Sequence, residues 1–95
     1  MQVNITGHHV DVTEGLRGHC DEKLARIKRH FDQAISIHVT LEVDNKVQKA
    51  SANLHASGHD FHAEAQDADM YLAIDAMTDK LDRQVLKYKE KLKAH

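Results

Sequence analysis

A chain of 95 residues, 41% of them hydrophobic and 29% charged, can build one hydrophobic core but is too short for two. Its single cysteine excludes an internal disulfide, and no apolar run approaches the roughly 20 residues that cross a bilayer. The opening residues also lack the basic, apolar and small-residue order of a signal peptide. We therefore expect a single domain over residues 1–95, located in the cytoplasm and not in a membrane.

In the first half of the chain, the spacing of apolar residues is typical first of a strand, then of a helix, then of a strand again. Residues 2–6 alternate apolar and polar side chains, which predicts a strand that ends at Gly7. Thr13 is a suitable N-cap for a helix. The apolar face of that helix, at spacings of three and four, consists of Leu16, Cys20, Leu24, Ile27 and Phe31. Residues 35–44 alternate again, and the side chains expected to point inward are Ile35, Ile37, Val39, Leu41 and Val43.

The second half predicts a hairpin, a short fourth strand and a long helix. Asn45 and Lys46 form a turn, after which residues 50–57 and residues 61–66 alternate as strands on either side of Gly58. A helix then runs from Asp69 to about Lys93, with Asp67 or Asp69 as its cap. Its apolar stripe consists of Met70, Ile74, Met77, Leu81, Val85, Tyr88 and Leu92.

This order of elements is β-α-β-β-β-α, and every element has one apolar and one polar face. Such a chain predicts an α+β fold in which two helices pack on one face of a four-stranded mixed sheet. The first helix acts as a right-handed crossover between two parallel strands, and hairpins join the remaining strands. The second face of the sheet is polar enough to be exposed to water.

The charges of the last third are sorted by sign. Residues 60–79 contain acids but no Lys or Arg, whereas from residue 80 onward bases dominate over Asp82 and Glu90. The bases are Lys80, Arg83, Lys87, Lys89, Lys91 and Lys93. They extend over more turns than the helix dipole requires, because that effect fades within one turn. The pattern favours a surface that binds a polyanion over a helix face that is merely solvated.

Several of these bases share a position relative to the buried stripe. Lys80, Arg83 or Gln84, Lys87 and Lys91 each precede a stripe residue, which places them about 100° around the helix from the core. Lys23 and Arg26 have the same offset on the first helix. We therefore expect the cations of both helices to converge into one electropositive ridge.

The chain also resembles the short hibernation promoting factors of the ribosome hibernation and sigma-54 modulation family. The resemblance rests on Gln2–Gly7, on Val12-Thr13 followed by Leu16-Arg17, on Asp69–Tyr71 with Ala73–Asp75, and most strongly on Asp79–Gln84. It implies a domain similar to double-stranded-RNA-binding domains, with the short form of the family ending near His95. It covers essentially the whole chain.

The resemblance implies a function without catalysis and without a cofactor. Members bind the small ribosomal subunit and its rRNA, occupy the channel of messenger and transfer RNA, and silence translation in stationary phase. A short form acts as a monomer beside a ribosome modulation factor and favours inactive ribosome dimers. The residues expected to contact rRNA are Arg17, Lys23, Arg26, Lys80, Arg83, Gln84, Lys87, Lys89 and Lys91, with Lys28, Arg29, Lys46 and Lys49 as weaker candidates.

Two other classes of function stay open at this level. Nine histidines, among them His38, His55 and His62 on neighbouring predicted strands, suggest a metal site, although no strong Cys/His signature is present and an exposed polar sheet face explains them better. They also suggest that protonation strengthens RNA binding. The acidic stretch of residues 60–79 suggests a module that binds a basic protein. No motif predicts an enzyme, and no base-stacking platform of the RNA-recognition-motif kind is expected on the strands.

Overall fold

Four strands and two helices follow one another in the order that the sequence predicts. Their bounds are β1 (Gln2–His8), α1 (Glu14–His30), β2 (Ala34–Asp44), β3 (Val47–Ala56), β4 (His59–Asp67) and α2 (Met70–Lys93). The structure is a computed structural model that describes residues 1–93 and, within α2, side chains up to residue 92. The cation predicted at Lys93 therefore lies outside the described side chains.

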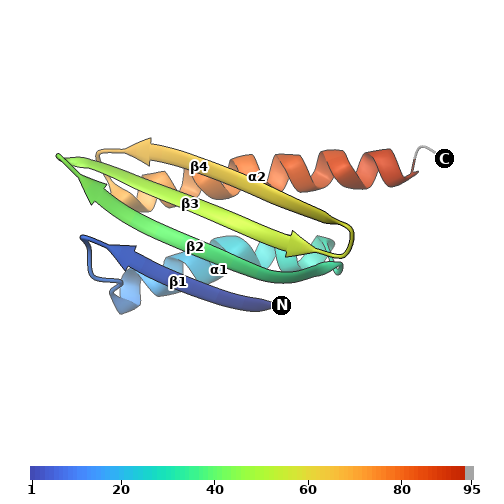
Figure 1. Ribbon diagram of the computed structural model, residues 1–95, viewed down its shortest axis with the longest axis horizontal. Helices are drawn as coiled ribbons and strands as arrows, with labels where there is room; N and C mark the ends of the chain where they lie inside the picture. Colours follow the sequence, from blue (N-terminus) through green and yellow to red (C-terminus); the bar gives the residue numbers. More distant parts are fainter. Residues whose placement is uncertain (94–95) are drawn as a thin grey trace.

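The strands form one mixed sheet in the order β1-β2-β3-β4. β1 pairs with β2 in parallel, whereas β2 with β3 and β3 with β4 are antiparallel. Both helices lie on the same face of this sheet, as predicted (Figure 1). α2 packs against β3, β4 and α1, so one of its sides faces the edge strand β4 and the other faces α1.

The hairpin turns explain how the three antiparallel strands stay in register. Asn45 and Lys46 have φ angles of 54° and 71°, as a two-residue hairpin of type I′ requires. The turn between β3 and β4 contains Gly58, whose φ of 83° is a conformation that glycine adopts without strain.

Polar side chains fix the start of each helix. The Oγ1 atom of Thr13 accepts a hydrogen bond of 3.2 Å from the backbone N–H of Leu16, which confirms Thr13 as the N-cap of α1. At α2, Oδ1 of Asp69 accepts from the N–H of Tyr71 at 2.8 Å, and Asp67 accepts from the N–H of Asp69. Within the described residues, neither helix is long and apolar enough to cross a bilayer.

The core lies between the helices and the sheet. Its fully buried members include Leu24 and Ile27 of α1, Ile37 of β2, and Met77 and Leu81 of α2. Small side chains on β3 and β4 allow α2 to approach the sheet closely; the buried ones are Ala50, Ala52, Ala56, Ala63 and Ala65. Cys20 is also completely buried, and this burial, with Asp21 as a lesser cause, raises the pKa of its thiol to about 11. Cys20 is therefore a core residue, as predicted, and not an activated nucleophile.

Two residues predicted to point into the core are exposed instead. The pairing of β2 with β3 shifts between Ala34 and Ser36, so Ile35 belongs to a bulge and is 51% exposed. Leu92 is 46% exposed. α2 extends past the turn between β3 and β4, which leaves no sheet beneath its last turn (Figure 1). Both predictions were wrong because a regular period was continued beyond the point where the neighbouring element ends or shifts.

Candidate nucleic-acid-binding surface

α2 has two polar flanks on either side of its buried stripe. Contacts of Lys80 and Gln84 with β4 identify the first, which we call the β4 flank; the residues at this helical position are Lys80, Arg83, Gln84, Lys87 and Lys91. Contacts with α1 identify the second, which we call the α1 flank; its residues are Asp75, Asp82 and Lys89. The predicted line of cations on the second helix thus faces the free edge of the sheet.

The edge strand β4 holds the β4 flank in place through its backbone. Nζ of Lys80 donates a hydrogen bond of 2.9 Å to the carbonyl oxygen of Glu64, and Nε2 of Gln84 donates one of 2.8 Å to the carbonyl oxygen of His62. Four residues of helix advance about 6 Å and two residues of strand about 6.7 Å, so the two elements stay in step. These contacts use carbonyl groups that an edge strand leaves without a partner strand.

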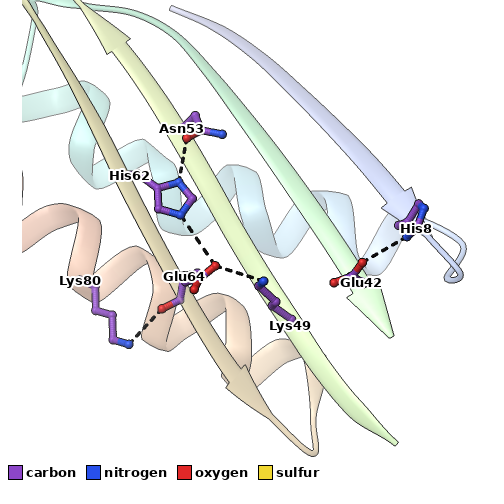
Figure 2. A network of polar contacts seen from close by, with 7 residues as sticks. All are labelled: His8, Glu42, Lys49, Asn53, His62, Glu64 and Lys80. Carbon is purple, nitrogen blue, oxygen red and sulfur yellow. Dashed lines mark hydrogen bonds and ion pairs between the residues drawn. The ribbon is translucent and has the colours of Figure 1, made fainter. Parts of the chain in front are cut away.

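The carboxylate of Glu64 does not pair with Lys80. The Glu64 side chain lies on the water-exposed face of the sheet, where its Oε2 is 3.2 Å from Nζ of Lys49 and 3.8 Å from Nε2 of His62 (Figure 2). The hydrogen bond and charge of Lys49 hold the pKa of Glu64 below its usual value. Lys80 therefore contacts a neutral carbonyl of Glu64 and keeps its own charge uncompensated.

The other cations of the β4 flank are equally uncompensated. Arg83, Lys87 and Lys91 are exposed, and none of them forms an ion pair with a carboxylate among the side chains that the structure describes. Spacings of three and four residues place them along one line of a rigid helix. The flank is thus a row of solvated positive charges at fixed intervals, as a chain of phosphates requires.

The cations of α1 do not continue this row. Nζ of Lys23 is 3.6 Å from Oδ1 of Asp75, so Lys23 faces the α1 flank of α2 and lies on the far side of α2 from Lys80. Lys89 also lies on the α1 flank, where it donates to the carbonyl oxygen of His30. The prediction of one continuous ridge from both helices was wrong, because α2 stands between the two sets.

Arg17 and Arg26 are both exposed on α1. Arg26 follows Lys23 by one turn and so borders the groove between the helices. Arg17 lies about 120° around α1 from Lys23, on the other side of the buried stripe. The predicted contacts of α1 therefore divide between two directions, and only Arg26 and Lys23 lie near α2.

The groove between the helices contains two close histidine–aspartate contacts that the sequence did not predict. Nε2 of His19 is 2.6 Å from Oδ1 of Asp75, and Nε2 of His30 is 2.6 Å from Oδ1 of Asp82. Each pair is partly buried. The spacing of eleven residues between the histidines and seven between the aspartates puts each set on one helix face, but it does not say that the faces meet.

The remaining histidines among residues 1–93 lie mainly on the water-exposed face of the sheet and are not grouped around a common point. His55 contacts Asp60 at 2.5 Å, Nδ1 of His62 contacts Asn53 at 2.7 Å, and Nε2 of His38 contacts Thr6 at 3.2 Å. Among residues 1–93, no group of three or more His, Cys, Asp or Glu side chains is arranged to hold a metal ion.

The acidic stretch of residues 60–79 does not form one surface. Asp60 and Glu64 lie on the exposed sheet face, Asp69 caps α2, and Asp75 faces α1. The contiguity of these acids in the sequence is lost because the chain passes from a strand through a turn into a helix. A docking face for a basic protein, one of the alternatives above, is therefore not assembled from this stretch.

Fold and flank together define a small α+β domain whose two helices cover one sheet face and whose second helix presents an uncompensated row of cations. The sequence profile of the family described as "Sigma 54 modulation protein / S30EA ribosomal protein" matches residues 3–93. The chain belongs to this family, which confirms the resemblance seen in the sequence. The hibernation factors of this family are non-enzymatic, as was predicted.

Relatives match over nearly their whole length. A ribosome hibernation promoting factor of Azotobacter vinelandii is 52% identical over 91 residues, which are 96% of this chain and 85% of the relative. That of Escherichia coli (strain K12) is 44% identical over 95 residues, covering 100% of both chains. The solved structure of a ribosomal subunit interface protein from Coxiella burnetii superposes with a TM-score of 0.89 at 32% identity, covering 95% of this chain and 99% of the other. The observed fold is thus shared with ribosome-associated proteins.

Proposed function

We propose that this chain is a ribosome hibernation factor that binds rRNA of the small ribosomal subunit through the β4 flank of α2. The single observation that carries the proposal is the row of exposed cations Lys80, Arg83, Lys87 and Lys91, held at fixed spacing and without carboxylate partners among the described side chains. The names of the relatives, hibernation promoting factor and ribosomal subunit interface protein, support the ribosome as the polyanion.

Binding through this flank needs no chemistry. Folded rRNA presents closely spaced phosphates, and cations on a rigid helix gain counterion release without losing much conformational freedom on binding. Arg83 can grip a phosphate with two N–H donors, whereas the lysines act as point charges. Lys23, Arg26 and Lys89 line or border the groove on the other side of α2 and provide a second, weaker set of contacts. Arg17 points elsewhere and contributes least.

The mechanism that follows is occlusion. A bound domain of this size blocks the channel of messenger and transfer RNA, so translation stops in stationary phase and resumes when the domain leaves. In the proposed state the chain acts in the cytoplasm as a monomer, together with a ribosome modulation factor, and favours inactive ribosome dimers. Sucrose-gradient profiles of ribosomes with and without the chain test these last steps directly.

The proposal is tested by reversing the charge of the β4 flank. We expect the variant Lys80→Glu/Arg83→Glu/Lys87→Glu to bind small subunits at least about a hundredfold more weakly in co-sedimentation, because three phosphate contacts become repulsive. The slope of log affinity against log salt should also fall by about 1 for each lost contact. The free energy of unfolding, measured by thermal denaturation, should change by less than about 0.5 kcal/mol, since the three side chains are exposed.

A matched control reverses three exposed cations elsewhere. Lys28→Glu/Arg29→Glu/Lys46→Glu makes the same change in net charge on α1 and on the turn between β2 and β3. We expect this control to retain most of the binding, because its cations lie off the β4 flank. Equal losses in the two variants would mean that only net charge matters, and retained binding of the first variant would refute the proposed surface.

A further inference from the structure

An aromatic cluster lies at the end of the β4 flank, where β4 begins. The ring of His59 is stacked on that of Tyr88, with centroids 4.8 Å apart and planes inclined by 22°. Phe61 meets both rings edge to face, at 4.5 Å from His59 and 5.4 Å from Tyr88. Phe31 of the core contacts Phe61 and Tyr88 in the same manner. The rings of His59 and Tyr88 therefore pack against the core through Phe61 and Phe31.

The exposure of these rings increases outward. Phe61 is only 5% exposed, Tyr88 is half-buried, and His59 is exposed. A hollow of about 200 Å³ opens beside them, and its lining residues are His59, Phe61, Gln84, Lys87, Tyr88 and Lys91. The lining of the hollow thus combines three aromatic rings with two lysines of the β4 flank.

The register of α2 along β4 explains why lysines border the rings. Lys80 contacts the carbonyl of Glu64 and Gln84 that of His62, so four helix residues correspond to two strand residues. One more step brings Lys87 and Tyr88 level with the start of β4. Lys91 follows one turn later. The row of cations therefore ends in an aromatic pocket, whereas the rest of the β4 flank runs along a bare strand edge.

We propose that this pocket binds one unstacked nucleobase of single-stranded RNA, with Lys87 and Lys91 on the flanking phosphates. A base has a flat π face that stacks on an exposed aromatic ring such as His59. The phosphates on either side of that base need cations close to the ring. Both requirements meet at this place. An apolar peptide side chain would use the rings but gain nothing from two solvated lysines, so the charge favours RNA. The inference rests on the proposed function and adds to its phosphate contacts a site that holds a base.

The test compares oligonucleotides with and without bases. The probe is hexauridylate, whose bases are exposed, and its partner is the abasic hexamer with the same phosphates. We expect hexauridylate to bind at least about fivefold more tightly than the abasic chain, and the ring protons of His59 and Tyr88 to shift upfield in NMR spectra. Equal affinities for the two hexamers, or unmoved ring signals, would overturn the proposal.

Variants locate the base at the pocket. His59→Ala should remove the preference for hexauridylate over the abasic chain, whereas His59→Phe, which keeps an aromatic face, should retain it. His55→Ala, which removes another exposed histidine at the same end of the sheet but on its opposite, water-exposed face, should change nothing. A preference that survives His59→Ala would place the base elsewhere and refute the assignment. The thermal transition of each variant shows that the fold is intact.

Failure of this inference is distinguishable from failure of the proposed function. Co-sedimentation of the wild-type chain with small subunits reports the proposed function and does not depend on one base. If subunits bind but bases make no difference to the hexamers, the pocket assignment alone is wrong. If bases are preferred but subunits do not bind, the pocket assignment stands and the ribosomal function falls.

Discussion

The two flanks of α2 both carry charged residues but differ in the sign of the charge and in what they face. The β4 flank lies against the backbone edge of a strand, which offers carbonyl oxygens but no carboxylates to its lysines. The α1 flank lies against another helix, and there Asp75 and Asp82 are matched by His19, Lys23 and His30. One flank therefore keeps its charge for an external polyanion, while the other uses its charge to join the helices.

This difference shows why a run of lysines in a sequence does not define a binding surface by itself. Lys80 and Lys89 are both bases of the same helix, and both donate to a carbonyl oxygen. Lys80 stays exposed beside other cations, whereas Lys89 is half-buried in a groove that contains two aspartates. The field at each position depends on the neighbouring element, and the predictions below test this division.

The largest expected effect on stability comes from breaking the α1 flank at Asp82. His30 has a buried Nδ1 atom without a hydrogen-bond partner, so within the described residues its contact with Asp82 is the ring's one polar interaction. Asp82→Ala removes this partner and leaves a partly buried imidazole unsatisfied. We expect a loss of about 1–3 kcal/mol in the free energy of unfolding, measured in urea by circular dichroism.

The matched control for this change is Glu90→Ala, which removes an exposed acid from the same helix. It should alter the free energy of unfolding by less than about 0.5 kcal/mol. Binding of the folded chain to small subunits should survive Asp82→Ala, because the β4 flank is untouched. If Asp82→Ala and Glu90→Ala lower the free energy of unfolding by the same small amount, the α1 flank does not join the helices in the way described.

A smaller effect is expected from the two glycines in the first turns of α1. A Cβ atom at Gly18 would meet no other atom within 4 Å, so Gly18→Ala gains helix propensity without a clash. We expect it to stabilise the protein by about 0.5–1 kcal/mol, measured by thermal unfolding. The same change at Gly15 would place a Cβ atom 2.6 Å from the hydroxyl oxygen of Tyr71, which must move aside.

Gly15→Ala is therefore the control for Gly18→Ala and should gain less. Tyr71 is exposed, and its ring contacts that of His19 in the groove between the helices, with centroids 5.1 Å apart. Displacing Tyr71 therefore weakens the contact of the α1 flank with α1, to which Asp82 also contributes. Neither change should affect binding through the β4 flank. A larger gain for Gly15→Ala than for Gly18→Ala would contradict the contact between Gly15 and Tyr71.

The fold could be predicted because the spacing of apolar residues within each helix and strand indicates the type of that element. Apolar residues alternate in residues 35–44 and recur at spacings of three and four from Met70 to Tyr88. Both patterns show which face of the element is buried, so they can be read from a single sequence. The same periodicity placed Lys80, Gln84, Lys87 and Lys91 on one line, and the structure keeps them there. What a single element determines about itself was therefore accessible from the sequence.

Relations between elements were not accessible in this way. Periodicity gives the angle of Lys23 around α1 but not the direction from which α2 approaches, so the meeting of Lys23 with Asp75 was missed. The bulge that exposes Ile35 depends on the register of β2 against β3. The stacking of His59 on Tyr88 joins residues 29 positions apart in the sequence and follows from the packing of α2 along β4. Each miss concerns a pairing, which sequence spacing does not specify.

The smallest expected effect concerns the carboxylate of Glu64, and it tests why Lys80 keeps its charge. Lys49 holds the pKa of Glu64 below the ordinary value, first by its hydrogen bond and then by its charge. A lowered pKa means that the pair contributes stability above the ordinary pKa of 4.5 and loses it as the pH falls through the folded value. Lys49→Ala should raise the pKa of Glu64 toward its ordinary value, which a carbon-13 NMR titration of the side-chain carboxyl would measure.

Lys80→Ala provides the decisive comparison for that titration. Lys80 contacts the backbone oxygen of Glu64, whereas Lys49 contacts the carboxylate on the other side of the strand (Figure 2). Removing Lys80 should therefore leave the titration of Glu64 almost unchanged while it weakens binding to small subunits. Removing Lys49 should raise the pKa of Glu64 but leave binding to small subunits almost unchanged. If Lys80→Ala raised the pKa of Glu64 as much as Lys49→Ala, the carboxylate would be a partner of the β4 flank, and its cations would not be available to a polyanion in the way that their geometry indicates.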